Sequence, residues 1–577
     1  MESSNQDVQE KPTGSKINVT DVGKSYYYSL PFLGTYLALC FNLSACTGGF
    51  ALIAPILSIV NEDIGPDPSI IWVALVYSIG QGIGLALIGR LSDLFGRRYF
   101  LIFASALGLI GCIICATAKS VPVLIGGEAL VGLSAAGGAS YTSVLSEMVP
   151  VKHRFPAQSF IYLWQLPTAG FGPALAYIFI LNTQAGWRWC YYYNIMWNGL
   201  SLILFIAFYF PPTFEEKHGK EDIYKWLKKY DYFGTGLFIA GEVLFLLGLS
   251  WGGSVYPWRS AYVISTLVVG VITLIAFATY ETKMNLEEPF VPKGLFRRRS
   301  WVAVVILIGV CGGVYYAFAL VWPRMVTALY SDPNDLLQVG YEACVVALGI
   351  TAGQIVGCGL SRPLGRTKFQ LIGSIAAGAI CLSSMTTCDQ YTRARATALL
   401  FLGTFFIGWA DGVAQIMCGI DIADQKDIGV ACGMMGTIRA SFGAGCAAIY
   451  STILTNELSS KVPGQVVPAV LDAGLPKGSV TQFLQALTSG NVTMLQEVKG
   501  VTATIIQDGS SALKQASADS YQVVFFSSIA FSVLAFVCAF FTADVDKYLT
   551  NTVSAMVGRT KPTVEEVEMV MGPKSDV

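Results

Sequence analysis

Three carboxylates lie inside segments that are otherwise apolar, and they are the residues of this chain best suited to carry protons. Glu128, Glu242 and Asp411 each interrupt a long run of hydrophobic residues. A charged carboxylate at the centre of a bilayer costs about 2.5 kcal/mol or more unless it is protonated, paired or hydrated. The chain has only 2 histidines, His153 and His218, and both fall in polar loops. Proton-linked chemistry is therefore expected to use the carboxylates.

These carboxylates are expected to differ in role. Glu128 is the first candidate to take up a proton itself, and Asp411 is a further candidate. For Glu242, a structural hydrogen bond is favoured over proton coupling. Arg439, in the run Arg-Ala-Ser-Phe-Gly, is a candidate to neutralise a carboxylate or to contact an anionic cargo. A structural ion pair is the simpler interpretation of this arginine.

A second group of charged residues lies in the run 89–98, Gly-Arg-Leu-Ser-Asp-Leu-Phe-Gly-Arg-Arg, between two long apolar segments. Charge this dense between membrane spans must lie in a tight turn at the membrane surface. Its aspartate is expected to face the positive end of a nearby helix, and its last two arginines to stay at the lipid headgroups or to pair with carboxylates of neighbouring helices. The alternative is that the arginines only anchor the topology. We call this contact the latch, and predict that it consists of Gly89, Asp93, Gly96, Arg97 and Arg98, with Glu147 and Arg154 as partners.

The composition is that of an integral membrane protein. Of the 577 residues, 54% are hydrophobic and only 13% are charged, which is unusual for a soluble protein. Taking about 20 apolar residues for each crossing, we predict an all-α membrane protein with about fourteen transmembrane helices. The expected spans are residues 33–58, 70–89, 99–118, 121–145, 158–181, 191–210, 233–251, 261–280, 301–323, 339–360, 369–387, 396–417, 428–453 and 521–543.

The distribution of positive charge predicts the orientation of the chain. Lys and Arg gather in the short loops on one side of the expected spans, for example at 97–98, 225–229 and 297–299. Loops rich in these residues stay in the cytosol, so both termini are predicted to be cytosolic. The plasma membrane is the expected location, with a vacuolar or vesicle membrane as the alternative.

A weak internal repeat indicates how the chain is organised. The run 91–97, Leu-Ser-Asp-Leu-Phe-Gly-Arg, aligns with 360–366, Leu-Ser-Arg-Pro-Leu-Gly-Arg. The aspartate has become Arg362, so the second copy is not expected to play the same electrostatic part. Parallel halves related by duplication occur in transporters, and we predict two six-helix halves with a two-helix insert. The predicted divisions are a cytosolic tail at 1–30, an N-terminal half at 31–210, linkers and insert at 211–299, a C-terminal half at 300–545 with an external loop at 455–520, and a cytosolic tail at 546–577.

Two local features complete this picture. In the external loop, apolar residues spaced over 480–487 predict a short amphipathic helix, and Asn491, in the run Asn-Val-Thr, is a candidate glycosylation site. In the fifth span, Gly172 and Pro173 are expected to let the helix bend and pack closely at the interface between the halves. Ordinary helix packing would explain the same Gly-Pro pair.

Several classes of function are disfavoured. A net charge of -1 gives no field that would attract nucleic acid. The run 80–84, Gly-Gln-Gly-Ile-Gly, has no Lys-Ser or Lys-Thr after it, which disfavours an ATP-driven pump. The 14 cysteines lie in or beside apolar segments, so neither a metal site nor a cofactor is expected. The expected partners are the lipid bilayer, protons and a small-molecule cargo, and aromatic residues such as Tyr315 and Tyr316 would suit a bulky, largely apolar one.

The spacing of the latch resembles the loop between the second and third helices of major facilitator superfamily transporters. The runs Asn-Glu-Asp-Ile-Gly at 61–65, Trp-Arg-Trp-Cys at 187–190 and Trp-Gly-Gly-Ser-Val-Tyr-Pro-Trp at 251–258 resemble the fungal fourteen-helix group that contains the trichothecene efflux pump. That group is related to siderophore-iron transporters. The resemblance implies a major facilitator fold and no enzyme activity. It implies proton-coupled export of a toxin, drug or secondary metabolite by alternating access.

The resemblance also bears on two of the candidate sites. The segment around Gly172 and Pro173 resembles a motif of proton-coupled antiporters, with Ala176 in place of a glycine. Glu128 stands where such antiporters usually carry arginine, so coupling through an arginine is not implied here. Two alternatives stay open: siderophore-iron uptake, and a receptor that transports nothing and binds its ligand through the loop at 455–520.

Overall fold

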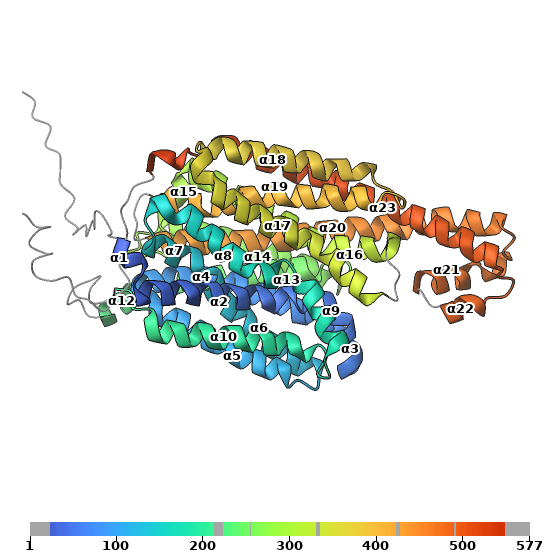
Figure 1. The fold of residues 1–577 in the computed structure, drawn as a ribbon, viewed down its shortest axis with the longest axis horizontal. Coiled ribbons are helices and arrows are strands. Elements are labelled where there is room, and N and C mark those ends of the chain that lie inside the picture. The colour runs from blue at the N-terminus through green and yellow to red at the C-terminus, as the bar shows by residue number, and fades with distance from the viewer. Residues whose placement is uncertain are drawn as a thin grey trace, which may run out of the picture.

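Almost every residue of the described chain belongs to an α-helix, and most of the helices run in one common direction (Figure 1). The computed structural model describes residues 24–212, 223–253, 255–330, 335–422, 427–489 and 492–548. Within these ranges the only β-type pairings are isolated bridges, at Tyr230 with Glu288 and at Gly252 with Tyr256. The predicted all-α fold class is therefore confirmed.

The helices are described in three groups along the chain. The first group is α2 (Leu30–Ala51), α3 (Leu57–Ile64), α4 (Ile71–Phe95), α5 (Arg97–Ala116), α6 (Val121–Ala139), α7 (Tyr141–Met148), α8 (Arg154–Ala169), α9 (Gly172–Asn182) and α10 (Arg188–Phe208). The insert is α13 (Tyr232–Trp251) and α14 (Ala261–Lys283). The last group is α16 (Arg299–Leu329), α17 (Leu336–Leu364), α18 (Thr367–Ser384), α19 (Arg393–Ile420), α20 (Ile428–Asp472) and α23 (Ala503–Phe541). Short helices α1 (Lys24–Tyr27), α12 (Ile223–Lys229), α15 (Lys293–Arg297), α21 (Val480–Ser489) and α22 (Val492–Gln496) complete the order.

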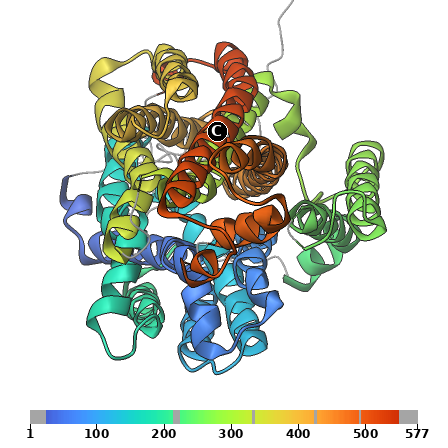
Figure 2. The same ribbon diagram turned by 90° about the vertical axis from the view of Figure 1, so that its right-hand side faces the viewer.

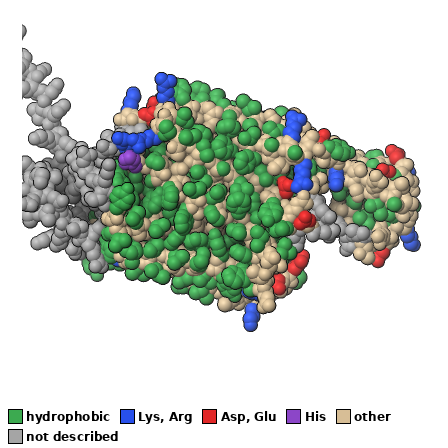
Figure 3. Space-filling model, viewed as in Figure 1, with side chains coloured by type: hydrophobic (Ala, Val, Ile, Leu, Met, Phe, Trp, Pro, Cys, Tyr) green, Lys and Arg blue, Asp and Glu red, His purple; other side chains and the backbone are tan. Residues whose placement is uncertain are grey.

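The surface matches a protein that sits in a bilayer. Figure 3 shows hydrophobic side chains over the middle of the molecule and charged side chains at its two ends. Among the described residues, 11 helices are long and apolar enough to cross a membrane. The segments expected at 158–181, 191–210 and 428–453 also form helices, but they are not among the 11. The predicted count of fourteen therefore stays a prediction.

Three of the expected spans consist of two helical pieces each. The span expected at 33–58 breaks after α2 at a short 3-10 turn that contains Pro55. The span expected at 121–145 changes direction at Ser140, between α6 and α7. The span expected at 158–181 breaks between α8 and α9, where Pro173 lies in the first turn of α9. Proline has no amide hydrogen to donate and starts a helix more readily than it continues one.

The segment at 455–520, predicted as an external loop, is mostly helical. α20 continues to Asp472 and α23 already begins at Ala503, so both helices project beyond the bundle, where α21 and α22 pack beside them (Figure 1). Val466, Phe483 and Ile505 are buried in a small apolar core of this extension. The amphipathic helix expected over 480–487 corresponds to α21. The glycosylation candidate Asn491 lies outside the described residues.

The insert stands to one side of the two halves, as Figure 2 shows. α13 contacts both α4 and α20, so it covers the line where the halves meet. On α4, the ring of Trp72 packs edge-on against that of Trp251, with 5.9 Å between centroids. Just beyond α13, the indole of Trp258 donates a hydrogen bond of 2.7 Å to Thr452 of α20. The insert therefore touches both halves at once.

Close packing of α17 on α19 depends on small residues. A Cβ atom added at Gly353 would overlap the carbonyl oxygen of Phe405 and would lie 2.8 Å from the amide nitrogen of Trp409. Both are backbone atoms, which move only if the whole helix moves. By contrast, a Cβ atom added at Gly373 of α18 would meet nothing within 4 Å.

We predict that Gly353→Ala lowers the melting temperature of the detergent-purified protein, because forcing the two helices apart costs about 1–3 kcal/mol. Gly373→Ala is the matched control. It should leave the melting temperature unchanged or raise it slightly, since alanine is the better helix former by about 1 kcal/mol. Equal melting temperatures for the two variants would show that α17 and α19 do not pack as closely as described.

Candidate functional site

Arg97 is the centre of the latch. Its guanidinium lies 2.7 Å from Asp93 and 3.0 Å from Glu147, and only 2% of its side chain is exposed. Asp93 lies near the end of α4, and Glu147 lies near the end of α7. The pairing offsets the cost of burying a cation, because each buried charge has an opposite charge beside it.

Asp93 also joins the two halves. Its Oδ2 atom accepts a hydrogen bond of 2.8 Å from the backbone amide of Val430, in the first turn of α20. The first amides of a helix lack partners within that helix and form its positive end. From the sequence, Asp93 is expected to face the amino end of the next helix in the chain, which is α5. The structure shows that the helix end belongs to α20, far away in the sequence.

Glycines allow α4 and α20 to meet at this point. A Cβ atom added at Gly89 would lie only 2.5 Å from the carbonyl oxygen of Gly429. Gly96 has φ +94°, a conformation that other residues rarely adopt, and it ends α4 so that α5 can begin at the next residue. Both predicted latch glycines therefore lie where a larger residue would disturb the contact.

The other arginines of the predicted latch have different surroundings. Arg98 stays at the surface, where it donates to the carbonyl of Ile206 and lies 3.8 Å above the ring of Phe210. Arg154 is buried, and its hydrogen bonds go to backbone carbonyls, including that of Gly419 in α19 at 3.3 Å. Arg154 thus adds a second contact between the halves at the same end of the molecule.

Two residues of the latch region were not expected from the sequence. Arg90 of α4 forms an ion pair of 2.8 Å with Glu288, which lies in the linker after α14. This pair ties the insert to the latch. His153 ends a short 3-10 turn just before α8, and its partial burial and the positive charges of Arg362 and Lys152 lower its pKa. The lowered pKa favours the uncharged form of this histidine.

The second copy of the motif is held in another way. Arg366 adopts the left-handed conformation with φ 51°, and its backbone amide donates to Asp546. Thr367 donates a hydrogen bond of 3.2 Å to Asp544. Both aspartates follow α23, so the carboxylates come from the same half of the chain. The second copy therefore makes a contact within its own half, whereas the first copy makes one between halves.

Glu128 lies away from the line between the halves. Its Oε1 atom accepts a hydrogen bond of 2.8 Å from the hydroxyl of Tyr191 on α10. Its Oε2 atom is buried and has no hydrogen-bond partner among the described residues. Only 1% of the residue is exposed. The carboxylate is therefore enclosed within the N-terminal half.

Glu242 belongs to the insert and reaches α20. Its carboxylate accepts a hydrogen bond from the hydroxyl of Ser441. The residue is buried where α13 packs against α20. This geometry agrees with the structural hydrogen bond expected for Glu242. The role of the residue stays a prediction.

Asp411 and Arg439 form an ion pair between α19 and α20. The shortest distance is 3.4 Å, from Arg439 Nε to Asp411 Oδ1. The carboxylate is 2% exposed and the guanidinium 21%. Gln354 of α17 and Gln415 of α19 each donate a hydrogen bond of 2.8 Å to Asp411 Oδ2. The sequence places the aspartate and the arginine in separate spans, and the structure brings them together.

Arg439 of this pair borders a cavity of about 140 Å³ between the halves, as do Gln354 and Gln415, which bind Asp411. The N-terminal half contributes Phe50, Tyr77 and Gln81 to its walls. The C-terminal half contributes aromatic, amide and cationic side chains, among them Tyr315, Tyr316, Gln354 and Arg439. The cavity thus combines apolar rings with a few polar groups, as sites for small molecules usually do.

Hydrogen bonds across the cavity link its charged pair to the N-terminal half. The hydroxyls of Tyr141 and Tyr162 donate to Gln415 Oε1 at 3.2 and 3.1 Å. Gln158 donates to both hydroxyls, at 2.9 and 2.8 Å. These four residues were not predicted from the sequence. The spacing of Asp411 with Gln415, and of Gln158 with Tyr162, is four residues on a helix, and this was the available signal.

The predicted Gly-Pro pair also lies where the two halves meet. Gly172 faces Ala51 of α2, with 3.0 Å from an added Cβ atom to the Cβ of Ala51. Next to Pro173, the amide of Ala174 donates to the thiol of Cys344 on α17 at 3.4 Å. The pair thus starts α9 at a contact with both halves.

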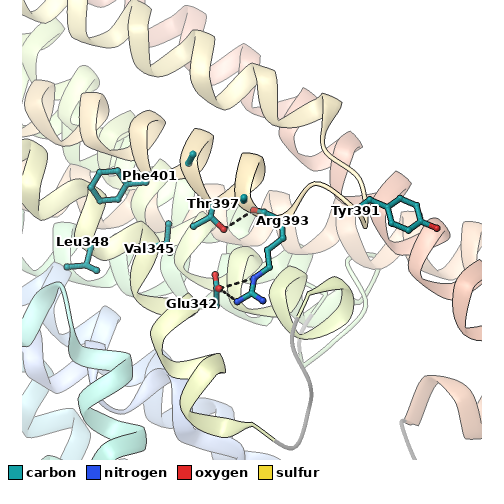
Figure 4. A pocket seen from close by; sticks show the side chains of 9 residues that line it. Glu342, Val345, Leu348, Tyr391, Arg393, Thr397 and Phe401 are labelled. Atoms are coloured by element: carbon teal, nitrogen blue, oxygen red, sulfur yellow. Dashed lines mark hydrogen bonds and ion pairs between the residues drawn. The ribbon is translucent and has the colours of Figure 1, made fainter.

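A larger groove lies within the C-terminal half, along α17 and α19 (Figure 4). It has a volume of about 810 Å³. An ion pair of Glu342 with Arg393 lies at one part of the groove, and Val345, Leu348 and Phe401 line the rest. Its lining includes neither Arg439 nor the two glutamines that bind Asp411. We therefore consider the smaller cavity to be the candidate site, because it combines contacts from both halves with the buried charges.

Two helical halves, a central cavity and a contact that closes one end define a membrane transporter of the major facilitator type. The solved structures agree: the proton:xylose symporter XylE has a TM-score of 0.50 over 92% of this chain and 98% of that chain, at 15% identity. The human organic anion transporter MFSD10 has a TM-score of 0.50 over 87% of this chain and 99% of that chain, at 11% identity. At these identities the likeness shows the fold alone.

Within that class, the chain belongs to the fungal trichothecene efflux pump family, whose sequence profile matches residues 3–570. The trichothecene efflux pump TRI12 of Fusarium sporotrichioides is 28% identical over 93% of this chain and 90% of its own. TRI12 of Trichoderma arundinaceum is 27% identical over 96% and 91%. The efflux pump FUS6 of Gibberella fujikuroi is 24% identical over 86% of each chain. The family expected from the sequence is confirmed.

We predict that Asp93→Ala opens the latch. Removing one partner of a buried ion pair costs about 3–5 kcal/mol, because the other charge stays buried without it. Cys432 of α20 is buried beside the latch and lines the cavity. Its alkylation by a water-soluble maleimide, measured by peptide mass spectrometry on the purified protein, should become about tenfold faster.

Arg98→Ala is the matched control for this measurement. It changes a charge of the same turn, but its contacts stay within the N-terminal half. It should leave the alkylation rate of Cys432 near that of the unchanged protein. If Asp93→Ala also left the rate unchanged, the contact of Asp93 with α20 would not hold the halves together.

Proposed function

We propose that this protein is a secondary active transporter that exports a toxin, drug or secondary metabolite across a cell membrane in exchange for protons. The observation that carries the proposal is Arg439, which is paired with Asp411 and lines a cavity between two halves that are in contact at one end. A charged pair at this place can respond to both a proton and a cargo. No enzyme chemistry is required of it.

The contacts at the latch end support alternating access. Asp93 binds the amide of Val430, Arg154 binds the carbonyl of Gly419, and Ser159 donates to the carbonyl of Ile355 at 2.7 Å. Each of these bonds joins one half to the other. All of them must break before the cavity can open at this end. The excess of Lys and Arg in the loops at this end supports a cytosolic latch, with both termini cytosolic.

The cavity supports a bulky, largely apolar cargo without net charge. Rings of Phe50 and Tyr316 approach edge-on across the halves, with 5.8 Å between centroids, and provide apolar contact area. Asp411 neutralises Arg439, so the site has no unbalanced charge to attract an ion. The relatives named as efflux pumps, TRI12 and FUS6, support a fungal metabolite as cargo and export as the direction. Export from the cell favours the plasma membrane as the location, with a vacuolar or vesicle membrane as the alternative.

Position favours Asp411 over the other carboxylates as the proton carrier. It lies between α17, α19 and α20, and its hydrogen bonds lead to both halves. Glu128 stays a candidate because half of its carboxylate lacks a partner among the described residues. Glu242 already shares a hydrogen bond with Ser441, which supports a structural role. The three can be separated by mutation.

The test of this function is flux of labelled compounds in proteoliposomes with an imposed pH gradient. Trichothecene-like toxins, azole drugs and ferric siderophores would be compared in both directions. Gradient-dependent movement of a toxin or drug out of the compartment that represents the cytosol is the expected result. Movement of a ferric siderophore toward that compartment would indicate uptake instead. Binding of a compound without any flux would indicate a receptor and would overturn the proposal.

We predict that Asp411→Asn lowers gradient-driven flux by about tenfold or more, a loss equivalent to about 1.4 kcal/mol of transition-state stabilisation. The amide keeps the shape of the carboxylate but does not take up or release a proton. Exchange of labelled for unlabelled cargo without a gradient should change much less, since that process needs no proton.

Glu128→Gln is the companion variant, again of equal shape. If Asp411 carries the proton, Glu128→Gln should keep gradient-driven flux within about twofold of the unchanged protein. The opposite pattern, with loss in Glu128→Gln and not in Asp411→Asn, would assign the proton to Glu128 as the sequence first suggests.

A further inference from the structure

We propose that Gln415 is a positioning residue that transmits the charge state of Asp411 to the N-terminal half, and so to the latch end of the transporter. The inference rests on the proposed function, because it assumes that Asp411 takes up a proton during transport. It concerns a residue that carries no charge and would be passed over in a search for ionisable groups.

Gln415 holds both sides of the link in one planar amide. Its Nε2 atom donates to Asp411 Oδ2 at 2.8 Å, within the C-terminal half. Its Oε1 atom accepts from Tyr141 and Tyr162 of the N-terminal half, at 3.2 and 3.1 Å. Because the nitrogen and the oxygen belong to the same rigid group, a rotation that removes one set of bonds also removes the other.

The N-terminal side of the link is itself held in place. Gln158 donates to the hydroxyls of Tyr141 and Tyr162 at 2.9 and 2.8 Å. The hydroxyls of Tyr141 and Tyr162 also lie 2.9 Å apart, so the single hydroxyl hydrogen of Tyr141 can go to Tyr162 or to Gln415. All four polar side chains of this cluster are buried. Buried hydrogen bonds of this kind are costly to leave unmade, so the two tyrosines depend on Gln415 as an acceptor.

One face of α19 carries the link to the latch end. Asp411, Gln415 and Gly419 follow at intervals of four residues, which places them one above the other on a helix. The carbonyl of Gly419 accepts a hydrogen bond from Arg154 at 3.3 Å. α19 therefore contacts α7 and α8 from the charged pair down to the end where Asp93 binds α20. A shift of this face would loosen the contacts made by both Gln415 and Gly419.

Protonation of Asp411 changes the balance of these bonds. As a carboxylate, it accepts from Gln354 and Gln415 at Oδ2 and lies beside Arg439. A proton from water adds to a carboxylate oxygen, and no other bond is made or broken. The neutral acid holds the guanidinium and the amides less strongly, since bonds to charged groups are about twice as strong as neutral ones. The amide of Gln415 can then turn away and release the tyrosines.

The surroundings of Asp411 include other ionisable groups on every helix packed against it. Those that face it are Arg439 on α20, Cys311 and Tyr316 on α16, Cys358 on α17, Tyr141 on α7 and Tyr162 on α8. Thiols and phenols stay neutral in the range where a carboxylate titrates. Among the groups named here, Asp411 is the carboxylate, and the proposal assigns the proton to it.

The direction of this response suits export. When the latch end is closed, a proton that reaches Asp411 weakens the link and favours opening toward the latch side. After the proton leaves on that side, the ionised aspartate again holds Gln415, which favours closure around a newly bound cargo. Each cycle then moves one proton inward and cargo outward.

The experiment uses the full-length protein in detergent and in proteoliposomes. Alkylation of Cys432 by the maleimide is measured from pH 5 to 8 in the unchanged protein, with the intrinsic pH dependence of thiol reactivity taken from the peptide of the unfolded protein. The corrected rate should rise as the pH falls. Gln415→Met, which has a similar size and no hydrogen bonds, should show a fast rate at every pH, with the pH response reduced about tenfold.

Ser159→Ala is the matched control. Its hydroxyl bond to Ile355 also joins the halves near the same level, but it has no contact with Asp411. This variant should keep the pH response of the unchanged protein. The double variant Asp411→Asn with Gln415→Met should behave like either single variant, because both changes cut the same link.

Two results would overturn the inference. One is a normal pH response in Gln415→Met. The other is an equal loss in Ser159→Ala, which would mean that any bond between the halves has this effect. If Gln415→Met does not fold, Tyr141→Phe with Tyr162→Phe removes the same bonds from the other side and should also flatten the response. Absence of gradient-driven flux in the unchanged protein would refute the proposed function alone, since the alkylation profile does not depend on flux.

Discussion

An ionised side chain buried in a membrane protein must have an opposite charge or several hydrogen bonds beside it, and this constraint organises the described structure. Arg97 lies between two carboxylates, Arg154 is surrounded by carbonyl oxygens, and Asp411 is paired with Arg439. Asp93, which pairs with Arg97, also binds α20 of the other half, and Arg154 binds Gly419 of the other half. Separating the halves at the latch end therefore exposes or strands charge. A transporter must offset that cost with a cargo or a proton each time it opens.

The two copies of the repeat meet this constraint in different ways. In the first copy, Asp93 binds the amino end of α20 and thereby joins the halves. In the second, Arg366 and Thr367 bind aspartates that follow α23, in the same half. Only the first copy acts across the interface. This explains physically how the second could lose its aspartate without loss of the fold, because a carboxylate from elsewhere in the chain takes its place.

Position relative to the interface also separates the buried carboxylates. Glu128 is as buried as Asp411, yet its hydrogen bond to Tyr191 keeps it within one half. Asp411 is connected through Gln415 to tyrosines of the other half. A change of charge alters the relative stability of two conformations only if the contacts of that group differ between them. The contacts of Asp411 meet this condition, because they lead to the other half. The insert adds a further link to the latch through the ion pair of Glu288 with Arg90.

Much of the fold could be predicted from the sequence alone. Apolar runs of about 20 residues predict helices that cross a bilayer, whatever lies beside them. The spacing of the latch, the repeat and the aromatic runs identify the superfamily and the family. The same local signals were less informative about helix ends: α20 and α23 extend into the segment predicted as a loop, and three spans are divided, two of them at prolines. Helix length and breaks depend on neighbouring helices as well as on propensity.

Only the tertiary structure decided which residues meet. That Asp411 pairs with Arg439, that Asp93 binds Val430 and that Gln415 contacts Tyr141 are facts about segments 28, 337 and 274 residues apart. The sequence does not indicate which partner a glutamine or a tyrosine inside a span will contact. The sequence by itself determined that this chain is a membrane transporter, because hydrophobicity and motif spacing are local properties. The arrangement that couples its charges to its motion is a property of contacts between distant helices, which packing alone decides.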